Sequence, residues 1–373
     1  MTNIIPSLEI IALILTLIHF GIPLAYYVYL KKKWLPKPWN LKINPKYTPR
    51  ITVIVPTYNE AKLIIEKLNN IYMQDYPKDK LEVLVVDSAS TDGTPRLVED
   101  WARKHTNFRV MLVKEPSRRG MAHALWTGFK HAKGDIIIVT DADAIWTKHD
   151  ILREIVKWLS CEDVGAISCI KEPLGGESLE YKYRQYYNIL RIAESKAWST
   201  PIFHGELSAF KKKLLKRIGG FPLGVGSAES LAAMKIAALG YRAIISDNVV
   251  VQEIIPRREY TKWRIRRAQH LIIHLIKTLS YIRNYNNMLK VIVLVEAYLH
   301  IINPWILLLC TIVLLYCTLI LHSILAGSLI ILGLALLAQR AYHAWIISQL
   351  FLLLAQIKNL WNKELVWKKQ EKV

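Results

Sequence analysis

A long apolar stretch lies near the start of the chain. Residues 7–30 contain one acid, Glu9, and no Lys or Arg, and a helix of this length crosses a hydrocarbon core of roughly 30 Å. Lys31, Lys32 and Lys33 follow directly. A cleaved signal peptide carries its positive charge before the apolar run, whereas here the charge comes after it. We therefore expect an uncleaved anchor whose end faces the cytoplasm.

A second apolar stretch occupies residues 291–357. Pro304 and the step at 322–323 are the expected break points, and Glu296 is expected to face protein, water or a headgroup rather than lipid. The length fits two helices that cross the membrane, at most three, with part of the run at the interface. The basic tail that follows suits a cytoplasmic end. The alternative is a buried helical core of a soluble protein.

Between these stretches, short apolar runs alternate with helical patterns. Alternating strands and helices imply a parallel sheet with both faces covered, and ligands of such sheets bind at the carboxyl ends of the strands. Polar clusters fall at those ends, at 57–60, 87–90 and 141–143. The expected strands are 51–55, 81–86, 108–113 and 136–140, and the expected helices are 59–72, 94–105 and 120–132.

Composition narrows the classes of partner. The 373 residues carry a formal net charge of +20. Because 52% of them are hydrophobic, a disordered basic protein is excluded. The four cysteines form no CxxC pair, which argues against a disulfide scaffold or a structural zinc site. Residues 31–290 hold 44 of the 50 Lys and Arg residues. This placement favours the lipid bilayer as a partner, and no nucleic acid is expected because aromatic and basic residues do not interleave.

Two acids follow the last predicted strand. Asp141 and Asp143 are two residues apart, so in an extended turn their carboxylates point the same way. Paired hard oxygens suit Mg²⁺ or Mn²⁺, although a solvated acidic loop is the commoner origin of such a pair. Asp87 ends another strand and can accept hydrogen bonds from a base or ribose, unless it caps a helix, a role that Ser90 or Asp92 fills better.

Taken in order, these motifs resemble the membrane-integrated branch of glycosyltransferase family 2, which has a GT-A catalytic domain. This branch includes ceramide glucosyltransferase, polyprenyl-phosphate sugar synthases, and hyaluronan, cellulose and chitin synthases. The matching segments are VIVPTYNE (53–60), VDSASTDGT (86–94), RRGMAHALWTGF (118–129), GDIIIVTDAD (134–143), HGELSAFKKKLLKRIGGF (204–221) and KWRIRRAQ (262–269).

The resemblance implies an α/β, Rossmann-like GT-A domain on the cytoplasmic side of a multi-pass protein of the cell membrane. The expected parts are an N-terminal anchor (1–34), the catalytic domain (46–256), a basic motif with an interfacial amphipathic helix (257–288), C-terminal transmembrane helices (289–358) and a cytoplasmic basic tail (359–373).

The same resemblance implies an inverting transfer of a sugar from a UDP- or GDP-sugar, with Mn²⁺ or Mg²⁺ as cofactor. Asp143 is expected to bind the metal. The residues expected to bind the donor are Pro56, Thr57, Asn59, Glu60, Asp87, Arg119, Asp141, Arg264 and Arg266.

A carboxylate is expected to take the proton from the acceptor hydroxyl. In the family this base is usually an Asp eleven residues before the glycine of a Gly-Tyr-Arg or Gly-Phe-Arg triplet. Counting back from Gly240 gives Glu229, whose alternative role is that of an acid favoured by a helix N-terminus. Further candidates on the acceptor side are His204, Glu206, Trp263 and Arg267.

The chain departs from the QxxRW motif of the polymer-making members. Arg267 stands where that motif has Trp, and Trp263 stands near its Gln. A single transfer to a lipid or lipid-linked acceptor is therefore preferred, and a phosphate acceptor would need no base. The alternatives are a processive polysaccharide synthase and a catalytically inactive membrane scaffold.

Overall fold

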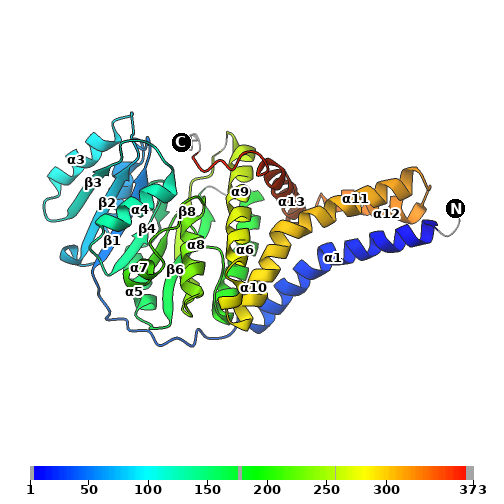
Figure 1. The fold of residues 1–373 in the computed structure, drawn as a ribbon, viewed down its shortest axis with the longest axis horizontal. Helices are drawn as coiled ribbons and strands as arrows, with labels where there is room; N and C mark the ends of the chain where they lie inside the picture. Colours follow the sequence, from blue (N-terminus) through cyan, green and yellow to red (C-terminus); the bar gives the residue numbers. More distant parts are fainter. Residues whose placement is uncertain (1–3, 175–178, 257, 367–373) are drawn as a thin grey trace.

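An eight-stranded mixed sheet forms the centre of an α/β domain, and long helices project from one side of it (Figure 1). The computed structural model describes residues 4–174, 179–256 and 258–366. Arg257 of the predicted basic motif and residues 367–373 of the predicted tail lie outside the described residues, as do residues 1–3 and 175–178.

The strand order is β3-β2-β1-β4-β7-β6-β8-β5. The first four strands in this order are parallel to one another and correspond to the four predicted strands. β7 runs antiparallel to both of its neighbours, and β5 runs antiparallel to β8. The strands are β1 (Ile51–Thr57), β2 (Leu81–Asp87), β3 (Arg109–Lys114), β4 (Ile136–Val139), β5 (Ala144–Trp146), β6 (Val164–Pro173), β7 (Ser208–Lys211) and β8 (Arg242–Glu253).

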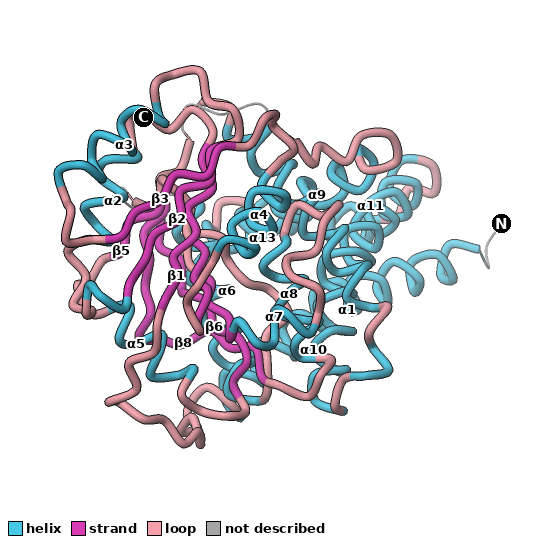
Figure 2. Tube along the Cα trace, turned by 60° about the vertical axis from the view of Figure 1, so that its left-hand side comes forward, coloured by secondary structure: helices cyan, strands magenta, loops and turns pink. Residues whose placement is uncertain are grey.

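Helices cover both faces of the sheet, which Figure 2 shows as magenta strands between cyan helices. One face packs against α2 (Ile64–Tyr72), α3 (Thr94–Lys104) and α5 (Ile151–Leu159). The other packs against α4 (Met121–His131), α7 (Lys212–Arg217) and α8 (Ala228–Ala237). The expected parallel sheet with two covered faces is thus confirmed for its first half.

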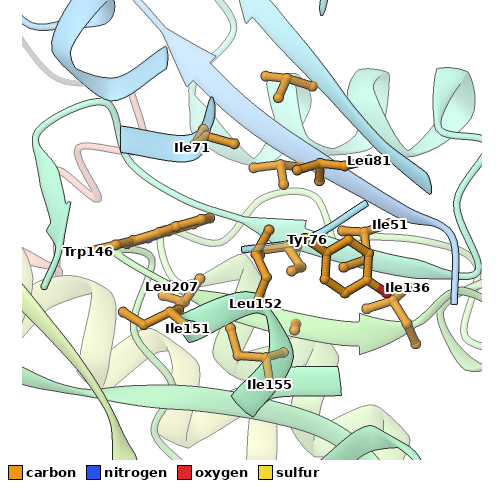
Figure 3. Close-up of a cluster of buried hydrophobic side chains, with 14 of the residues drawn as sticks. Ile51, Ile71, Tyr76, Leu81, Ile136, Trp146, Ile151, Leu152, Ile155 and Leu207 are labelled. Atoms are coloured by element: carbon orange, nitrogen blue, oxygen red, sulfur yellow. The ribbon is translucent and has the colours of Figure 1, made fainter. Parts of the chain in front are cut away.

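The alternation of side chains along β1 explains its continuous apolar sequence. Val53 and Val55 belong to the first core, whereas Ile54 belongs to the second. Figure 3 shows part of the first core, where Ile71 and Ile155 approach the sheet from helices on the same side. A strand that is buried on both faces needs apolar residues at every position.

Two described helices are long and apolar enough to cross a membrane. Ser7–Lys33 has 27 residues and Asn287–Leu319 has 33. They belong to α1 (Ile4–Lys33) and to the continuous run of α10 (Asn287–Ala297), the π-helix η3 (Tyr298–Ile302) and α11 (Asn303–Leu319). A third span exists only if α12 (Ile324–Leu336) and α13 (Arg340–Lys358), which bend by 106°, count as one.

The C-terminal break occurs at one of the two expected places. His322 has a φ of 53°, and the side chain of Ser323 accepts a hydrogen bond from the backbone N–H of Ala326 at the start of α12. The break expected at Pro304 is wrong. Pro304 lies in the first turn of α11, directly after the π-helix η3, and the helical run continues through it to Leu319.

Polar contacts join α1 to α11, and the two helices lie side by side in Figure 1. Thr16 Oγ1 and Cys310 Sγ are 3.2 Å apart, and His19 Nδ1 lies 3.0 Å from Asn303 Oδ1. Such contacts between apolar helices hold one helix at a fixed position along the other.

α6 (Leu179–Ala197) and α9 (Tyr260–Leu279) connect the α/β domain to the long helices. α13 packs against α9 through Leu352 and Ala355. Glu296 is fully buried, and its Oε2 lies 2.9 Å from Arg191 of α6. This acid therefore faces protein, one of the environments that the sequence left open. Two short 3₁₀-helices, η1 (Lys78–Lys80) and η2 (Ile282–Asn284), complete the described elements.

Candidate functional site

A cleft of about 440 Å³ opens at the carboxyl ends of β1, β2 and β4. This is where a sheet of this kind binds its ligands. The predicted residues that line it are Pro56, Thr57, Asn59, Glu60, Asp141, Asp143, His204, Glu206, Glu229, Trp263, Arg266 and Arg267. The predicted residues that do not line it are Asp87, Arg119 and Arg264.

The loops that follow β1 and β2 are bonded to each other. Asn59 has a φ of 55°, and its side-chain oxygen accepts a hydrogen bond from Thr91 N (2.8 Å). Its own backbone N–H donates to Ser90 Oγ (2.8 Å). Asp87 is buried beneath this turn and accepts from Ser90 N (3.0 Å), so in this structure it holds the loop rather than facing the cleft. Asp92 accepts from Thr94 N (3.1 Å) at the start of α3, but the N-cap position of this helix is Gly93, which has no side chain to cap it.

Asp141 and Asp143 both line the cleft, on the turn that joins β4 to β5. Behind them lies Lys67 of α2, whose Nζ donates to the carbonyl of Ala144 (3.0 Å). Burial lowers the pKa of Lys67 to about 7, against the attraction of the two aspartates. Sequence reasoning missed this lysine, although its spacing from Ile64 places it on the buried stripe of α2.

The residues present suit a hard divalent cation only in part. Across the three described ranges of the chain, no group of three or more His, Cys, Asp or Glu side chains could hold a metal ion by itself. Mg²⁺ and Mn²⁺ are commonly held by one or two carboxylates, with water and substrate phosphates as the other ligands. The pair Asp141 and Asp143 therefore fits a cation that arrives with a phosphate-bearing substrate.

Glu229 lies in the first turn of α8 and is only 4% exposed. Burial raises the pKa of its carboxyl to about 7, and the neighbouring charge of Glu206 adds to this shift. A Cβ on Gly205 would lie 2.8 Å from Glu229 Oε1 and 3.4 Å from Asp141 Oδ2. The two carboxyl groups therefore approach the same point in the cleft. A carboxyl with a pKa near neutrality is suited to accept a proton.

Glu206, the other predicted acid, is held by cations. Its Oε1 lies 2.8 Å from Lys171 Nζ and 3.3 Å from Arg267. Lys171 and Arg267 also form ion pairs with Glu253, at the end of β8. Glu253 lines the cleft and was not predicted, because nothing in the sequence marks the end of β8. These ion pairs hold the Glu206 side chain in place between two cations.

The helical period divides the basic residues of α9. Trp263, Arg266 and Arg267 line the cleft, and the guanidinium of Arg267 lies 4.7 Å from the centre of the Trp263 ring. Arg264 is one residue beyond Trp263, so it points about 100° away around the helix. Its Nη1 lies 3.4 Å from Glu180 on the other side. The predicted pair Arg264 and Arg266 is thus split between two environments.

Of the two adjacent arginines that precede α4, the one that lines the cleft is not the one that was predicted. Arg118 lines the cleft, with its guanidinium 3.7 Å from the centre of the Tyr58 ring. Arg119, the residue that sequence reasoning chose, lies 3.5 Å from Glu115 and does not line the cleft. Adjacent arginines in a loop carry no pattern that separates them, so the sequence could not decide between the two.

The segment after α13 returns to one wall of the cleft. Gln269 Nε2 donates to the carbonyl of Asn362 (2.6 Å), and a ring nitrogen of His270 lies 3.2 Å from the carbonyl of Glu364. A Cβ on Gly120 would lie 2.9 Å from the carbonyl oxygen of Leu365. The described part of the predicted basic tail is thus packed against the α/β domain.

Two family profiles match the chain. Residues 52–219 match "Glycosyl transferase family 2", and residues 136–358 match "Glycosyl transferase family group 2". The chain is also similar to the solved structure of mannosyltransferase PcManGT from Pyrobaculum calidifontis in complex with GDP-Man and Mn²⁺. The TM-score is 0.88 with 52% identity, over 95% of this chain and 99% of that one.

Curated relatives match over shorter lengths. The probable glycosyltransferase YdaM of Bacillus subtilis is 25% identical over 60% of this chain and 55% of its own length. Dolichyl N-acetyl-alpha-D-glucosaminyl phosphate 3-beta-D-2,3-diacetamido-2,3-dideoxy-beta-D-glucuronosyltransferase of Methanococcus voltae is 36% identical over 29% of this chain and 33% of its own length. The chain therefore spans about half or less of the length of these two relatives.

Proposed function

Because the chain belongs to glycosyltransferase family 2, we propose that it transfers mannose from GDP-Man to a lipid-linked acceptor at a membrane surface. The observation that carries this proposal is the meeting of Asp141 and Glu229 at Gly205. This geometry supports a role for Asp141 on the donor side and for Glu229 as proton acceptor in one cleft. The choice of GDP-Man over a UDP-sugar rests on the likeness to the mannosyltransferase.

The donor is expected to lie along the loops after β1, β2 and β4. Asn59 and Glu60 border the nucleotide, while Asp141 faces the sugar. Arg118 and Arg266 also line the cleft, and their guanidinium groups suit the oxygens of a diphosphate. Arg118 thus takes the donor-side role that the sequence had given to Arg119.

Asp143 would hold the metal, as a carboxylate ligand of a cation that arrives with the donor. When bound, Mn²⁺ or Mg²⁺ neutralises the charge that develops on the leaving diphosphate. Asp143 would fix the position of the cation in the cleft. Arg118 and Arg266, which line the same cleft, add to this stabilisation, since preorganised cations act on charge as it develops.

Glu229 is the proposed general base. Its carboxylate takes the proton of the acceptor hydroxyl while that oxygen forms a bond to the anomeric carbon. The bond between this carbon and the diphosphate oxygen breaks, and GDP leaves with the electron pair. Attack from the side opposite the leaving group inverts the anomeric configuration. The raised pKa of Glu229, caused by burial, matches the task of accepting a proton near neutral pH.

The acceptor is proposed to be lipid-linked because the cleft lies beside the helices that can span a membrane. Trp263 and Arg267, on the cleft wall formed by α9, belong to the helix against which α13 packs. The lysines at the end of α1 and the net charge of the middle segment support a cytoplasmic α/β domain at the membrane surface. The two candidate spans support a membrane-embedded, multi-pass arrangement.

The test is transfer of radiolabelled mannose. Full-length protein in proteoliposomes is supplied with GDP-Man, Mn²⁺ and extracted membrane lipid, and products are separated by thin-layer chromatography. We expect one labelled glycolipid, lost in Glu229→Gln and retained in the matched control Glu162→Gln, whose side chain is exposed. UDP-sugars serve as comparison donors.

Three results would contradict the proposal. A ladder of long products would point to a processive synthase. Turnover of UDP-sugars alone would overturn the choice of nucleotide. No release of nucleotide from any sugar donor would point to an inactive scaffold.

A further inference from the structure

A second cavity, of about 130 Å³, adjoins the cleft. Phe203, His204, Ser227 and Arg267 line both. Its remaining walls come mainly from α6, η3, α9 and α13. Since η3 belongs to the apolar helix Asn287–Leu319, this cavity lies where the α/β domain meets a helix long enough to cross a membrane.

The lining of the second cavity is cationic at one part and apolar at another. No Asp or Glu is among its described lining residues. Guanidinium groups are strong paired donors for phosphate oxygens, so the cationic part suits an anion and the apolar part suits a hydrocarbon chain. The arginines are Arg184, Arg191, Arg264 and Arg267, and the apolar residues include Ile202, Leu271, Phe351 and Leu352.

Carboxylates behind this lining hold the arginines in place. The carboxylate of Glu180 lies 2.8 Å from Arg184 and 3.4 Å from Arg264. Glu180 itself does not line the cavity. Arg191 is held in the same way by Glu194 (2.8 Å). The guanidinium groups are therefore fixed before any ligand arrives, which reduces the entropy lost on binding.

One donor in this lining lacks an acceptor. Arg264 is 9% exposed, and its Nε atom is buried without a hydrogen-bond partner in the described structure. His300 Nε2, which belongs to another lining residue, is in the same condition. Buried polar groups are normally satisfied, so their exceptions call for an explanation. Here both unpartnered atoms belong to residues that line the second cavity, where a ligand could satisfy them.

We propose that the second cavity binds the phosphate headgroup of the lipid acceptor. This inference rests on the proposed function, since it names the chemical class of the acceptor. The phosphate lies among the four arginines, and the first part of the lipid chain lies against Leu271, Phe351 and Leu352.

The position of the second cavity relative to Glu229 supports this assignment. Ser227 and Ser230 line the second cavity, and Glu229 stands between them in sequence and lines the cleft. A lipid held by its phosphate in the second cavity can therefore present the group attached to that phosphate to Glu229. The phosphate is the anchor, and the attacking oxygen belongs to the attached sugar.

The experiment measures binding of two lipids to full-length protein in nonionic detergent. The probes are polyprenyl phosphate and the matching polyprenol, which lacks the phosphate. We expect saturable binding of the phosphate lipid and at least about tenfold weaker binding of the alcohol. Arg264→Gln should weaken binding of the phosphate lipid by about tenfold. The matched control Arg258→Gln, at an exposed position of the same basic stretch, should bind as the wild type does.

A second measurement needs no variant. Wild-type protein is treated with phenylglyoxal, and modified arginines are mapped by mass spectrometry. Polyprenyl phosphate should protect Arg264, whereas polyprenol should not. Inorganic phosphate at the same concentration should protect it far less, since it lacks the apolar part. Equal protection by inorganic phosphate would assign the site to a free anion and overturn the lipid assignment, and equal binding of the two lipids would overturn the phosphate site.

Failure here is distinguishable from failure of the proposed function. Release of GDP from GDP-Man into water tests the donor cleft and needs no acceptor. If the wild type releases GDP while phosphate gives no advantage in lipid binding, the inference alone is wrong. If no sugar donor is turned over, the proposed function is wrong even where the phosphate lipid binds.

Discussion

Gly205 leaves the space beside the carboxyl group of Glu229: a Cβ at position 205 would lie 2.8 Å from Glu229 Oε1. The same atom would lie 3.2 Å from Met121 Cε and 3.4 Å from Asp141 Oδ2. All three neighbours are ends of side chains rather than backbone. A methyl group there can be accommodated by moving the carboxyl groups, so position 205 controls their placement more than it controls the fold.

Gly205→Ala is therefore expected to lower kcat with little loss of stability. A displacement of about 1 Å in a catalytic group can cost about 100-fold in rate, and we expect a loss of that order. The measurement is mannose transfer together with thermal unfolding in detergent. Gly21→Ala, where a Cβ would meet nothing within 4 Å, is the matched control and should leave both unchanged. A large fall in the unfolding temperature of Gly205→Ala would contradict this account.

The pH dependence of the reaction should report Glu229. Burial raises its pKa from 4.5 to about 7, so below pH 7 the carboxyl is protonated and cannot accept a proton. We expect kcat/KM to rise with pH up to about 7 and then to level off. Glu229→Gln should lose about 100- to 10,000-fold in rate and the pH dependence with it. A profile of the wild type that is flat from pH 5.5 to 8 would contradict the assignment.

The same shift has a consequence for stability. A carboxyl whose folded pKa is raised holds its proton in the folded state between pH 4.5 and about 7, while the unfolded state has lost it. Stability is therefore lost as the pH rises through this window. Glu229→Gln keeps the shape of the side chain and removes this loss, so at pH 8 it should unfold at a higher temperature than the wild type. Thermal unfolding at pH 5 and pH 8 measures the difference.

The sequence predicted the half of the sheet in which each strand is a continuous run of apolar residues. β1, β2 and β4 are buried on both faces, so their residues are apolar at nearly every position. β7 has only four residues and pairs antiparallel between β4 and β6. Its sequence, Ser208–Lys211, has no strand pattern of its own, so its partners rather than its residues define it.

The candidate site divides in the same way. Asp141 and Glu229 are marked by motifs and line the cleft as expected. Glu253 is brought to the cleft by tertiary packing alone, which a single sequence does not reveal, whereas Lys67, behind the aspartates, is marked as buried by its spacing from Ile64. The exclusion of Arg264 from the cleft could have been foreseen, because the helical period separates it from Trp263 by about 100°.

The Mn²⁺ concentration needed for mannose transfer should depend on the carboxylate of Asp143. We expect a chelator to abolish mannose transfer and Mn²⁺ to restore it. Asp143→Asn should need a Mn²⁺ concentration at least about tenfold higher for half-maximal rate, since an amide oxygen carries no charge. The exposed residue Asp79 supplies the control Asp79→Asn, which should titrate as the wild type does. Undiminished activity in the presence of chelator would contradict a metal at this site.

The last prediction concerns the junction between the α/β domain and the long helices. Arg191 of α6 is buried, with one side-chain nitrogen 2.8 Å from Glu194 and the other 2.9 Å from Glu296. Removal of the cation leaves the buried acid pair without its counter-charge, which typically costs about 3–5 kcal/mol. Arg191→Met should thus lower the free energy of unfolding by about that amount. Arg217→Met, at an exposed arginine of α7, is the control and should change it by less than about 0.5 kcal/mol.

The double variant separates this ion pair from simple loss of packing. If the cost of Arg191→Met comes from the charge left on Glu296, then adding Glu296→Gln should recover part of the lost stability. If the cost comes from lost packing of the arginine chain, the two changes should add. Chemical or thermal unfolding of the single and double variants in the same detergent measures the difference. Recovery would mean that the charge of Arg191 holds the long helix Asn287–Leu319 against α6, and with it the wall of the second cavity to which both Arg191 and His300 belong.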